Sequence, residues 1–171
     1  VVSENSSFYC GGSIPVLGRT DPVKCWKTAG HGSQTLTQAM QHSCNVALVQ
    51  IGQLVGARTF YKYAEAFGFL NLTNNVDSSL TAKTGIDLSG ESGSIWWSKN
   101  TFYDPENFSQ LAAASFGQTF TITPLQLITA VSACVNGGYL MKPYVVKSIV
   151  NGDGEAVVSN SPTVVRQVVS E

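Results

Sequence analysis

A helical run of apolar residues that breaks at a single point constrains this chain more than any other feature. Apolar side chains recur at helical spacing between residues 36 and 55, and the run is interrupted at Ser43-Cys44-Asn45. Serine and asparagine are poor residues for a helix interior, because their side chains compete for backbone hydrogen bonds, but they are good residues for helix ends. The sequence therefore predicts two helices that meet at residues 43–45, the first with Ser33 as its N-cap.

Local signals predict two more helices and a hairpin. Residues 57–67 follow an amphipathic pattern, and Thr123-Pro124 is typical of a helix start, because a capping side chain precedes a proline at the first helical position. β-Branched residues on both sides of a turn at residues 151–154 predict a β-hairpin. The buried face predicted for the helix after Thr123 consists of Leu127, Ile128, Val131, Cys134 and Val135.

Two stretches show no sustained period. Residues 1–30 are rich in Gly, Pro and Ser and predict an irregular lead-in with a small hairpin. For residues 69–110 the sequence predicts a long loop. Packing of Trp96-Trp97 is expected to anchor this loop, and a substrate platform is the alternative role of the two tryptophans. Because the helices come first and the hairpin later, the predicted fold class is α+β.

Charge and composition exclude some functions. The net charge is −1, so the chain lacks the basic surplus of a nucleic-acid-binding protein. No apolar run reaches the ~18 residues that a membrane span needs. The chain has neither an initiator methionine nor a signal peptide, and we expect it to be a part of a longer protein.

Several ordered motifs together resemble the class B penicillin-binding proteins. They are Gly30-His31-Gly32-Ser33, Gln41-His42-Ser43-Cys44-Asn45, Phe67-Gly68-Phe69, Thr84-Gly85-Ile86-Asp87-Leu88-Ser89-Gly90-Glu91, Phe116-Gly117-Gln118, Thr123-Pro124-Leu125-Gln126 and Asn136-Gly137-Gly138. Cys25-Trp26, His31-Gly32 and Ser43-Cys44-Asn45 together are similar to the sporulation-type subgroup. The resemblance implies that residues 1–171 are a partial transpeptidase domain, truncated at both ends. Its expected fold is the mainly helical portion of the penicillin-binding protein and β-lactamase fold with a C-terminal β-hairpin, and with the core sheet largely missing.

The same resemblance implies a D,D-transpeptidase that cross-links peptidoglycan stem peptides and is trapped by β-lactams. A serine acyl-enzyme is the expected intermediate of this acyltransferase. The protein is expected to lie outside the cytoplasm. Its expected membrane anchor is an N-terminal part that is absent from this chain. By motif, Ser43 would be a proton-relaying hydroxyl and Asn45 would hold the substrate amide, as in the family's S-x-N motif. Helix capping is the alternative role for both residues.

Two family motifs are absent from the sequence. No serine precedes a lysine by three residues, so S-x-x-K is missing. Lys83-Thr84-Gly85 imitates K-T-G, but Ile86-Asp87 follows it and it precedes the hairpin, so we interpret Lys83 as a solvated loop residue. The chain alone is therefore predicted to be inactive, and exposed faces of its incomplete core are expected to favour dimerisation.

The alternative function is a non-catalytic module that binds cell-wall peptides or a partner protein. A different serine hydrolase is disfavoured because G-x-S-x-G is absent.

Cysteine and histidine residues in the lead-in raise a separate hypothesis. Cys10, Cys25 and His31 precede the motif that contains Cys44, and all four would converge if the lead-in folded back on that motif. Three thiols and an imidazole suit a tetrahedral structural zinc. A disulfide, Cys25–Cys44 or Cys10–Cys25, is the competing hypothesis, and free thiols remain the third. No cofactor is expected for catalysis itself.

Overall fold

The computed structural model describes residues 2–70 and 82–170, so residues 71–81 of the predicted loop lie outside the described part. The described residues form two units. One contains the residues up to Lys62 together with Trp97–Phe120, and the other contains Tyr63–Trp96 and the residues from Thr121 onward, apart from the residues outside the described part. We describe each unit by itself.

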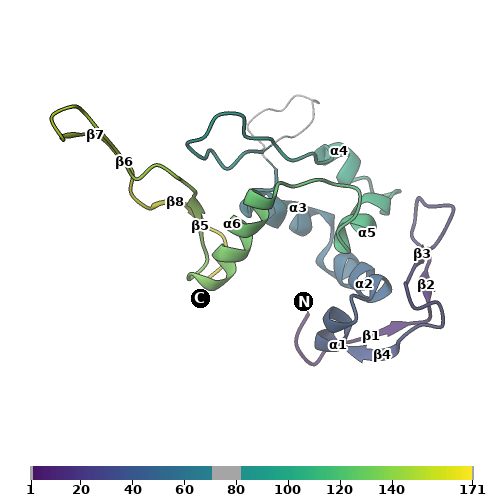
Figure 1. Cartoon of the computed structure of the whole chain (residues 1–171). Helices are drawn as coiled ribbons and strands as arrows, with labels where there is room; N and C mark the ends of the chain where they lie inside the picture. Colours follow the sequence, from purple (N-terminus) through teal and green to yellow (C-terminus); the bar gives the residue numbers. More distant parts are fainter. Residues whose placement is uncertain (1, 71–81, 171) are drawn as a thin grey trace. The chain divides into compact units, whose positions relative to one another are not determined.

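The first unit is built from short strands followed by helices (Figure 1). Strands β1 and β4 pair in antiparallel register, with Cys10 opposite Gly32, and strands β2 and β3 form a second antiparallel pair. Its elements are β1 (Ser7–Cys10), β2 (Ser13–Ile14), β3 (Val23–Lys24), β4 (Gly32–Thr35), α1 (Leu36–Gln41), α2 (Asn45–Val55), α3 (Ala57–Ala66), which continues into the second unit, α4 (Lys99–Phe102) and α5 (Ser109–Ser115).

The predicted helix break at residues 43–45 is confirmed, but the start of the first helix is not where the sequence placed it. Ser33 lies in β4, and α1 begins at Leu36 with Thr35 as its N-cap. The hydroxyl of Thr35 accepts from the amide of Gln38, and the Gln38 side chain accepts from the amide of Thr35. This reciprocal capping box satisfies two amides at the helix start, which Ser33 cannot do from within a strand.

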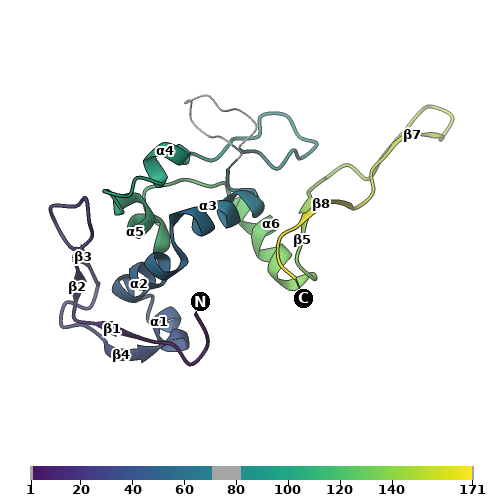
Figure 2. The same ribbon diagram turned by 180° about the vertical axis from the view of Figure 1, so that it is seen from behind.

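Helices α2 and α5 lie side by side in the first unit (Figures 1 and 2). Gly52 permits this approach, because a β-carbon there would lie 1.8 Å from the hydroxyl oxygen of Ser115. The contact buries Val49 and Ala112 completely. Helix α4 and the first two residues of α5, Ser109 and Gln110, fall inside the stretch 69–110 that the sequence predicts as loop. Packing against distant helices, rather than local periodicity, holds these short segments.

The predicted packing of Trp97 is confirmed within the first unit. Its ring lies against Phe102 and Phe120, with centroid distances of 5.6 and 6.3 Å. The buried hydroxyl of Tyr61 donates to the backbone carbonyl of Trp97 at 3.0 Å. Aromatic packing of this kind anchors an irregular segment that has no secondary structure of its own.

The second unit contains the end of α3, one longer helix and two strand pairs. Strand β5 pairs with β8, and β6 pairs with β7 across the predicted turn at residues 151–154, so the predicted hairpin is confirmed. The β6–β7 ribbon has every residue exposed and extends beyond the β5–β8 pair (Figure 1). The elements are α6 (Pro124–Val135), β5 (Tyr139–Lys142), β6 (Ser148–Val150), β7 (Ala156–Ser159) and β8 (Thr163–Gln167).

The predicted buried face of α6 is wrong. Ala130, Ala133 and Gln126 are its buried residues, and the side chain of Gln126 donates to the carbonyls of Gly68 and Ala82. The most apolar face of the helix is exposed, including the Cys134 thiol that was expected in the core: Leu127, Ile128, Val131, Cys134 and Val135. Small side chains allow α6 to approach its neighbours closely, whereas the larger ones lie on the side of the helix that is exposed to solvent.

None of the helices in the described residues has the length and apolar character that crossing a bilayer requires.

Candidate active site

The turn between α1 and α2 has the geometry of a Schellman motif. The amide of Ser43 donates to the carbonyl of Met40, and the amide of Cys44 donates to the carbonyl of Ala39, both at 3.0 Å. Ser43 has a φ of +45°, which is the left-handed conformation that such a helix end requires. The polypeptide therefore reverses within two residues, and α2 begins at Asn45.

Ser43 is an unusual residue for this position. Glycine, or sometimes asparagine, occupies it in most helices, because a β-carbon in the left-handed conformation costs about 1–2 kcal/mol. The side chain of Ser43 is exposed, so burial does not offset this cost. A serine kept at a strained, solvent-facing position is typical of a functional site.

Asn45 is held in place by a hydrogen bond from outside its own helix. Its side-chain amide donates to the backbone carbonyl of Lys24 at 3.0 Å, and the residue is half-buried. Because Asn45 is the first residue of α2, its side chain projects from the helix start beside the turn. Ser43 and Asn45 therefore flank one short bend, and the bend is open to solvent at Ser43.

The segment Lys24–Trp26 braces this turn at three points. Lys24 accepts from Asn45, the sulfur of Cys25 lies 3.9 Å from that of Cys44, and the indole of Trp26 donates to the carbonyl of His42 at 2.8 Å. This role of Lys24 and Trp26 was not predicted from the sequence. The one available signal was the pair Cys25-Trp26, which is part of the resemblance to the sporulation-type subgroup.

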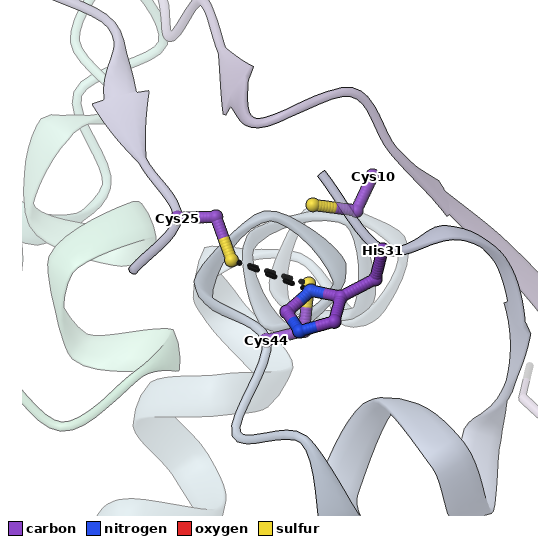
Figure 3. Close-up of side chains that lie close together, drawn as sticks. All are labelled: Cys10, Cys25, His31 and Cys44. Atoms are coloured by element: carbon purple, nitrogen blue, oxygen red, sulfur yellow. Dashed lines mark hydrogen bonds between the residues drawn. The ribbon is translucent and has the colours of Figure 1, made fainter. Parts of the chain in front are cut away.

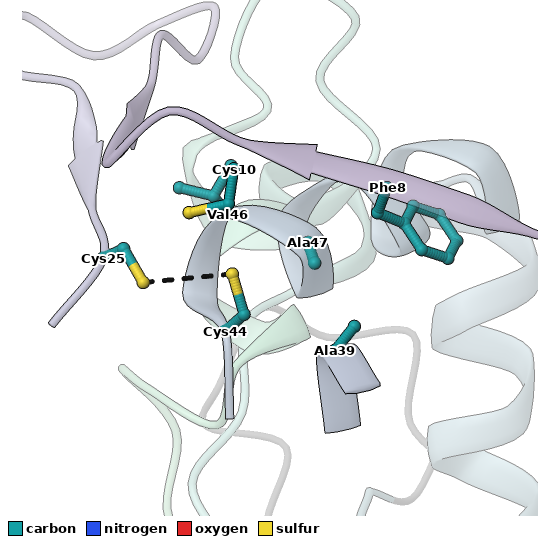
Figure 4. Packing of buried hydrophobic residues seen from close by; sticks show 7 residues of the cluster. All are labelled: Phe8, Cys10, Cys25, Ala39, Cys44, Val46 and Ala47. Atoms are coloured by element: carbon teal, nitrogen blue, oxygen red, sulfur yellow. Dashed lines mark hydrogen bonds between the residues drawn. The ribbon is translucent and has the colours of Figure 1, made fainter. Parts of the chain in front are cut away.

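The structure brings Cys10, Cys25, His31 and Cys44 together beside the turn (Figure 3). One ligand atom from each residue lies within 4.8 Å of all the others. The four residues come from the end of β1, the residue after β3, the residue before β4 and the N-cap of α2. The three cysteines are buried, and they also belong to a small apolar cluster with Phe8, Ala39, Val46 and Ala47 (Figure 4).

Two glycines allow the loop that carries His31 to approach β1. Gly12 and Gly30 have φ values of +96° and +78°. A β-carbon on Gly30 would lie 2.2 Å from the carbonyl oxygen of Cys10, and one on Gly12 would lie 2.1 Å from that of Thr28. No other residue fits these positions without moving the backbone, so the convergence of the cluster depends on both glycines.

Burial and backbone amides act differently on the thiols of this cluster. Burial raises the pKa of Cys44 to about 11. Burial also raises the pKa of Cys10, but hydrogen bonds from the backbone of His31 and Gly12 outweigh it, so the net pKa of Cys10 is lowered. Burial, together with His42 and Lys27, lowers the pKa of His31, which favours the neutral form of its imidazole.

All four cysteines are free thiols in the structure. A disulfide bond would need the sulfur atoms about 2.05 Å apart, which is much closer than the 3.9 Å that separates Cys25 and Cys44. The ring of His31 stacks on that of His42 at 4.8 Å, and its Nδ1 lies 3.5 Å from the sulfur of Cys25. Its Nε2 is buried and has no hydrogen-bond partner in the described part of the chain.

The second unit places Lys83-Thr84-Gly85 in a clamped loop rather than in a strand. The carboxylate of Glu91 accepts from the amide and hydroxyl of Thr84, each at 2.6 Å, and from the amide of Gly85 at 3.0 Å. Lys83 is exposed in this loop, which agrees with its interpretation as a solvated loop residue.

Asp87 has a similar structural role. Its carboxylate accepts from the amides of Val145 and Val146 at 2.8 and 2.9 Å, and these bonds lower its pKa. The carboxylates of Asp87 and Glu91 therefore both hold loops of the second unit.

Comparison with known proteins identifies the family. The family model described as "Penicillin binding protein transpeptidase domain" matches residues 1–171. Stage V sporulation protein D of Bacillus subtilis is 36% identical over 169 residues, which are 98% of this chain and 24% of that protein. The peptidoglycan D,D-transpeptidase MrdA of Escherichia coli K12 is 25% identical over 162 residues, which are 92% of this chain and 24% of that protein.

A solved structure supports the same relationship. Penicillin-binding protein A from M. tuberculosis, solved as a penicillin G acyl-enzyme complex, matches with a TM-score of 0.76 and 25% identity, over 99% of this chain and 36% of that one. The chain thus spans about a quarter of the length of these curated relatives. The predicted resemblance and the predicted α+β fold with an incomplete core sheet are confirmed, and the chain belongs to the penicillin-binding protein transpeptidase domain family.

Proposed function

We propose that this chain forms one wall of the acyl-transfer site of a peptidoglycan D,D-transpeptidase, with Ser43 and Asn45 as its contribution. The observation that carries the proposal is the exposed, left-handed Ser43 at the bend between α1 and α2. A residue chosen only to end a helix would be glycine, which has no strain in this conformation. The hydroxyl is retained although it costs stability, as expected for a residue that acts on a substrate.

The chemistry assigns different tasks to the two side chains. A hydroxyl that both donates and accepts can pass a proton between a nucleophile and a leaving group. The Asn45 side chain, which Lys24 holds in a single orientation, can bind the backbone of a peptide substrate. In the proposed reaction a serine outside this chain attacks the penultimate D-Ala carbonyl of a stem peptide and expels the terminal D-Ala. An amine of a neighbouring stem peptide then attacks the acyl-enzyme and releases the serine.

The nucleophile is proposed to lie elsewhere in the whole protein, because the 171 residues contain no S-x-x-K. A relay hydroxyl without a nucleophile or lysines has no proton to transfer, so this chain alone is not expected to react with a β-lactam. The proposed setting is the outer face of a bacterial cytoplasmic membrane, with an anchor outside this chain.

For the isolated chain we also predict self-association through the exposed face of α6, which size-exclusion chromatography at several concentrations would detect.

Labelling with a fluorescent penicillin tests the proposal on the full-length protein that contains this chain. The full-length protein should be labelled, and Ser43→Ala should slow labelling by about 100-fold, the lower end of the range for lost proton transfer. Ser159→Ala is the matched control, because Ser159 is an exposed serine on the β6–β7 ribbon and should not change the rate.

Three results would contradict the proposal. An unchanged rate in Ser43→Ala, with circular dichroism matching the wild type, would remove Ser43 from the site. Covalent labelling of the 171-residue chain would show that its nucleophile lies within it. Failure of the full-length protein to label, together with binding of stem peptides, would indicate a non-catalytic binding module.

A further inference from the structure

We propose that Cys10, Cys25, His31 and Cys44 bind one Zn²⁺ ion that fastens the lead-in segment to the turn carrying Ser43 and Asn45. The binding site goes beyond the proposed function. Its effect on the turn rests on that function, and the two are tested by separate measurements.

The interatomic distances match a zinc tetrahedron. With zinc–sulfur bonds of about 2.3 Å and zinc–nitrogen bonds of about 2.0–2.1 Å, neighbouring sulfurs lie about 3.8 Å apart, and sulfur and nitrogen about 3.6 Å apart. The sulfurs of Cys25 and Cys44 are 3.9 Å apart, and the sulfur of Cys25 is 3.5 Å from Nδ1 of His31. Two edges of the tetrahedron are thus already in place, and all the remaining pairs are within 4.8 Å.

The ligand types select zinc over the common hard cations. Thiolates and imidazole are soft or intermediate ligands that suit Zn²⁺, whereas Mg²⁺ and Ca²⁺ require oxygen ligands. Three sulfurs and one nitrogen complete four-coordination, which is typical of a structural rather than a catalytic zinc site. Figure 3 shows the side chains of all four residues directed toward one space, from four separate segments of the chain.

The N-terminus of α2 supports the site. Cys44 is the N-cap of α2 but makes no capping hydrogen bond, although Ser, Thr, Asp or Asn would provide one. A cluster of cysteines that served only as apolar core would require neither an imidazole among them nor a thiol at a helix start.

The local structure explains why a metal would be useful here. Strands β2 and β3 have two residues each, and the apolar cluster around the thiols contains small side chains apart from Phe8. Such a segment buries little apolar surface, and a zinc ion that binds only the folded state stabilises it through the free energy of binding. A disulfide, Cys25–Cys44 or Cys10–Cys25, would join only two of the three cysteines, and it would leave His31 and the third cysteine without a role.

Metal binding would also position the reactive turn. Cys44 lies between Ser43 and Asn45, and Cys25 lies between Lys24 and Trp26, which hold Asn45 and the carbonyl of His42. Ligation of both cysteines therefore fixes the segment Lys24–Trp26 against the turn at residues 43–45. Cys25 is a positioning residue in this proposal, because it acts through the turn and not on the substrate.

Metal analysis of the full-length protein, expressed with added zinc, tests the site directly. We expect one zinc per chain from these four residues, and cobalt substitution should give thiolate-to-cobalt charge-transfer absorption with the intense visible bands of tetrahedral Co²⁺. Cys10→Ser, Cys25→Ser, His31→Ala and Cys44→Ser should each lose the metal. Cys134→Ser and His42→Ala are the matched controls and should keep it, because Cys134 lies on the exposed face of α6 and His42, which stacks on His31, is not one of the four converging residues.

Cobalt spectra of the wild-type protein keep the test valid if a ligand variant fails to fold. Two results for the zinc content and the thiol count would overturn the proposal. In the first, the protein contains no zinc and every cysteine can be alkylated under denaturing conditions. In the second, the protein contains no zinc and two thiols are missing, which would indicate a disulfide. Retention of zinc and of the cobalt bands by all four ligand variants would also overturn it.

Penicillin labelling provides the second measurement. Removing zinc with a chelator should slow acylation by about tenfold while the protein stays folded, and returning zinc should restore the rate. An unchanged rate with stoichiometric zinc loss would refute the positioning effect alone. Loss of labelling in Ser43→Ala with full zinc content would separate the catalytic role from the metal site.

Discussion

Helices α2 and α6 differ at their N-termini: side chains cap the start of α6, whereas no side chain caps the start of α2. The difference distinguishes a helix start in the proposed site from one that serves only the fold. At α6, Thr123 accepts from the amide of Gln126 at 3.1 Å, and the Gln126 side chain accepts from the amide of Thr123 at 2.9 Å. At α2, the N-cap is Cys44 and its side chain caps nothing. A missing cap costs about 1 kcal/mol. The start of α6 is therefore arranged for helix stability, and the start of α2 gives up stability to place particular side chains.

Ser43→Gly should show the largest effect and sharpen this contrast. Glycine removes about 1–2 kcal/mol of left-handed strain but adds about 0.5–1 kcal/mol of unfolded-state entropy, so stability should stay equal or rise slightly. The loss of the hydroxyl should slow penicillin acylation of the full-length protein by about 100-fold. Urea unfolding and acylation kinetics measure the two quantities. A less stable Ser43→Gly protein would show that the serine is structural.

Cys44→Ser distinguishes a helix cap from a metal ligand, because the two roles predict opposite signs. If Cys44 were only an N-cap, serine should stabilise the protein by about 1 kcal/mol. If it is a zinc ligand, loss of the ion should cost about 3 kcal/mol at a free zinc concentration about 100 times the Kd, less the gain from the cap. We expect a net destabilisation of about 2 kcal/mol in zinc-containing buffer, measured by urea unfolding. In chelator the sign should reverse.

Thr123→Ala is the corresponding change at α6. It removes the hydroxyl that caps the helix, and we expect destabilisation of about 1 kcal/mol, without dependence on zinc. Thr123→Ser should recover most of this loss, because serine caps equally well. Thermal unfolding of the two variants with and without chelator provides the measurement. A zinc-dependent effect at Thr123 would remove the distinction between the two helix starts.

Asp87→Asn should have the smallest effect, and it should depend on pH. The backbone amides of Val145 and Val146 lower the pKa of Asp87 in the folded state. A lowered pKa means that the stabilisation is present above the unfolded-state pKa and disappears as the pH falls through the folded-state value. The wild type should thus exceed Asp87→Asn in stability at neutral pH, and the difference should vanish in acid.

Amide hydrogen exchange in the β6–β7 ribbon, compared across pH, would measure the Asp87 effect. Asp153→Asn is the control, since it removes the same charge from the hairpin turn. Equal effects of the two substitutions would show that net charge, rather than the two amide bonds, is responsible.

Local hydrogen bonding determined the parts that could be predicted from the sequence. The helix break at residues 43–45, the start of α6 at Thr123-Pro124 and the turn at residues 151–154 each involve groups within about five residues of one another. Caps and turns of this kind depend on the side chains nearby, so a single sequence carries the signal. The order of motifs along the chain was also enough to identify the family.

Tertiary contacts decided the rest, because burial depends on which distant segment supplies a partner. The periodicity of α6 could not show that Ala130 and Ala133 face the interior while Val131 and Cys134 face solvent. Likewise, the cysteine spacing allowed a metal site, a disulfide or free thiols, and only the register of β1 with β4 brings Cys10 beside His31. The sequence by itself determined where the chain turns, whereas the tertiary structure decided which side chains meet at those turns.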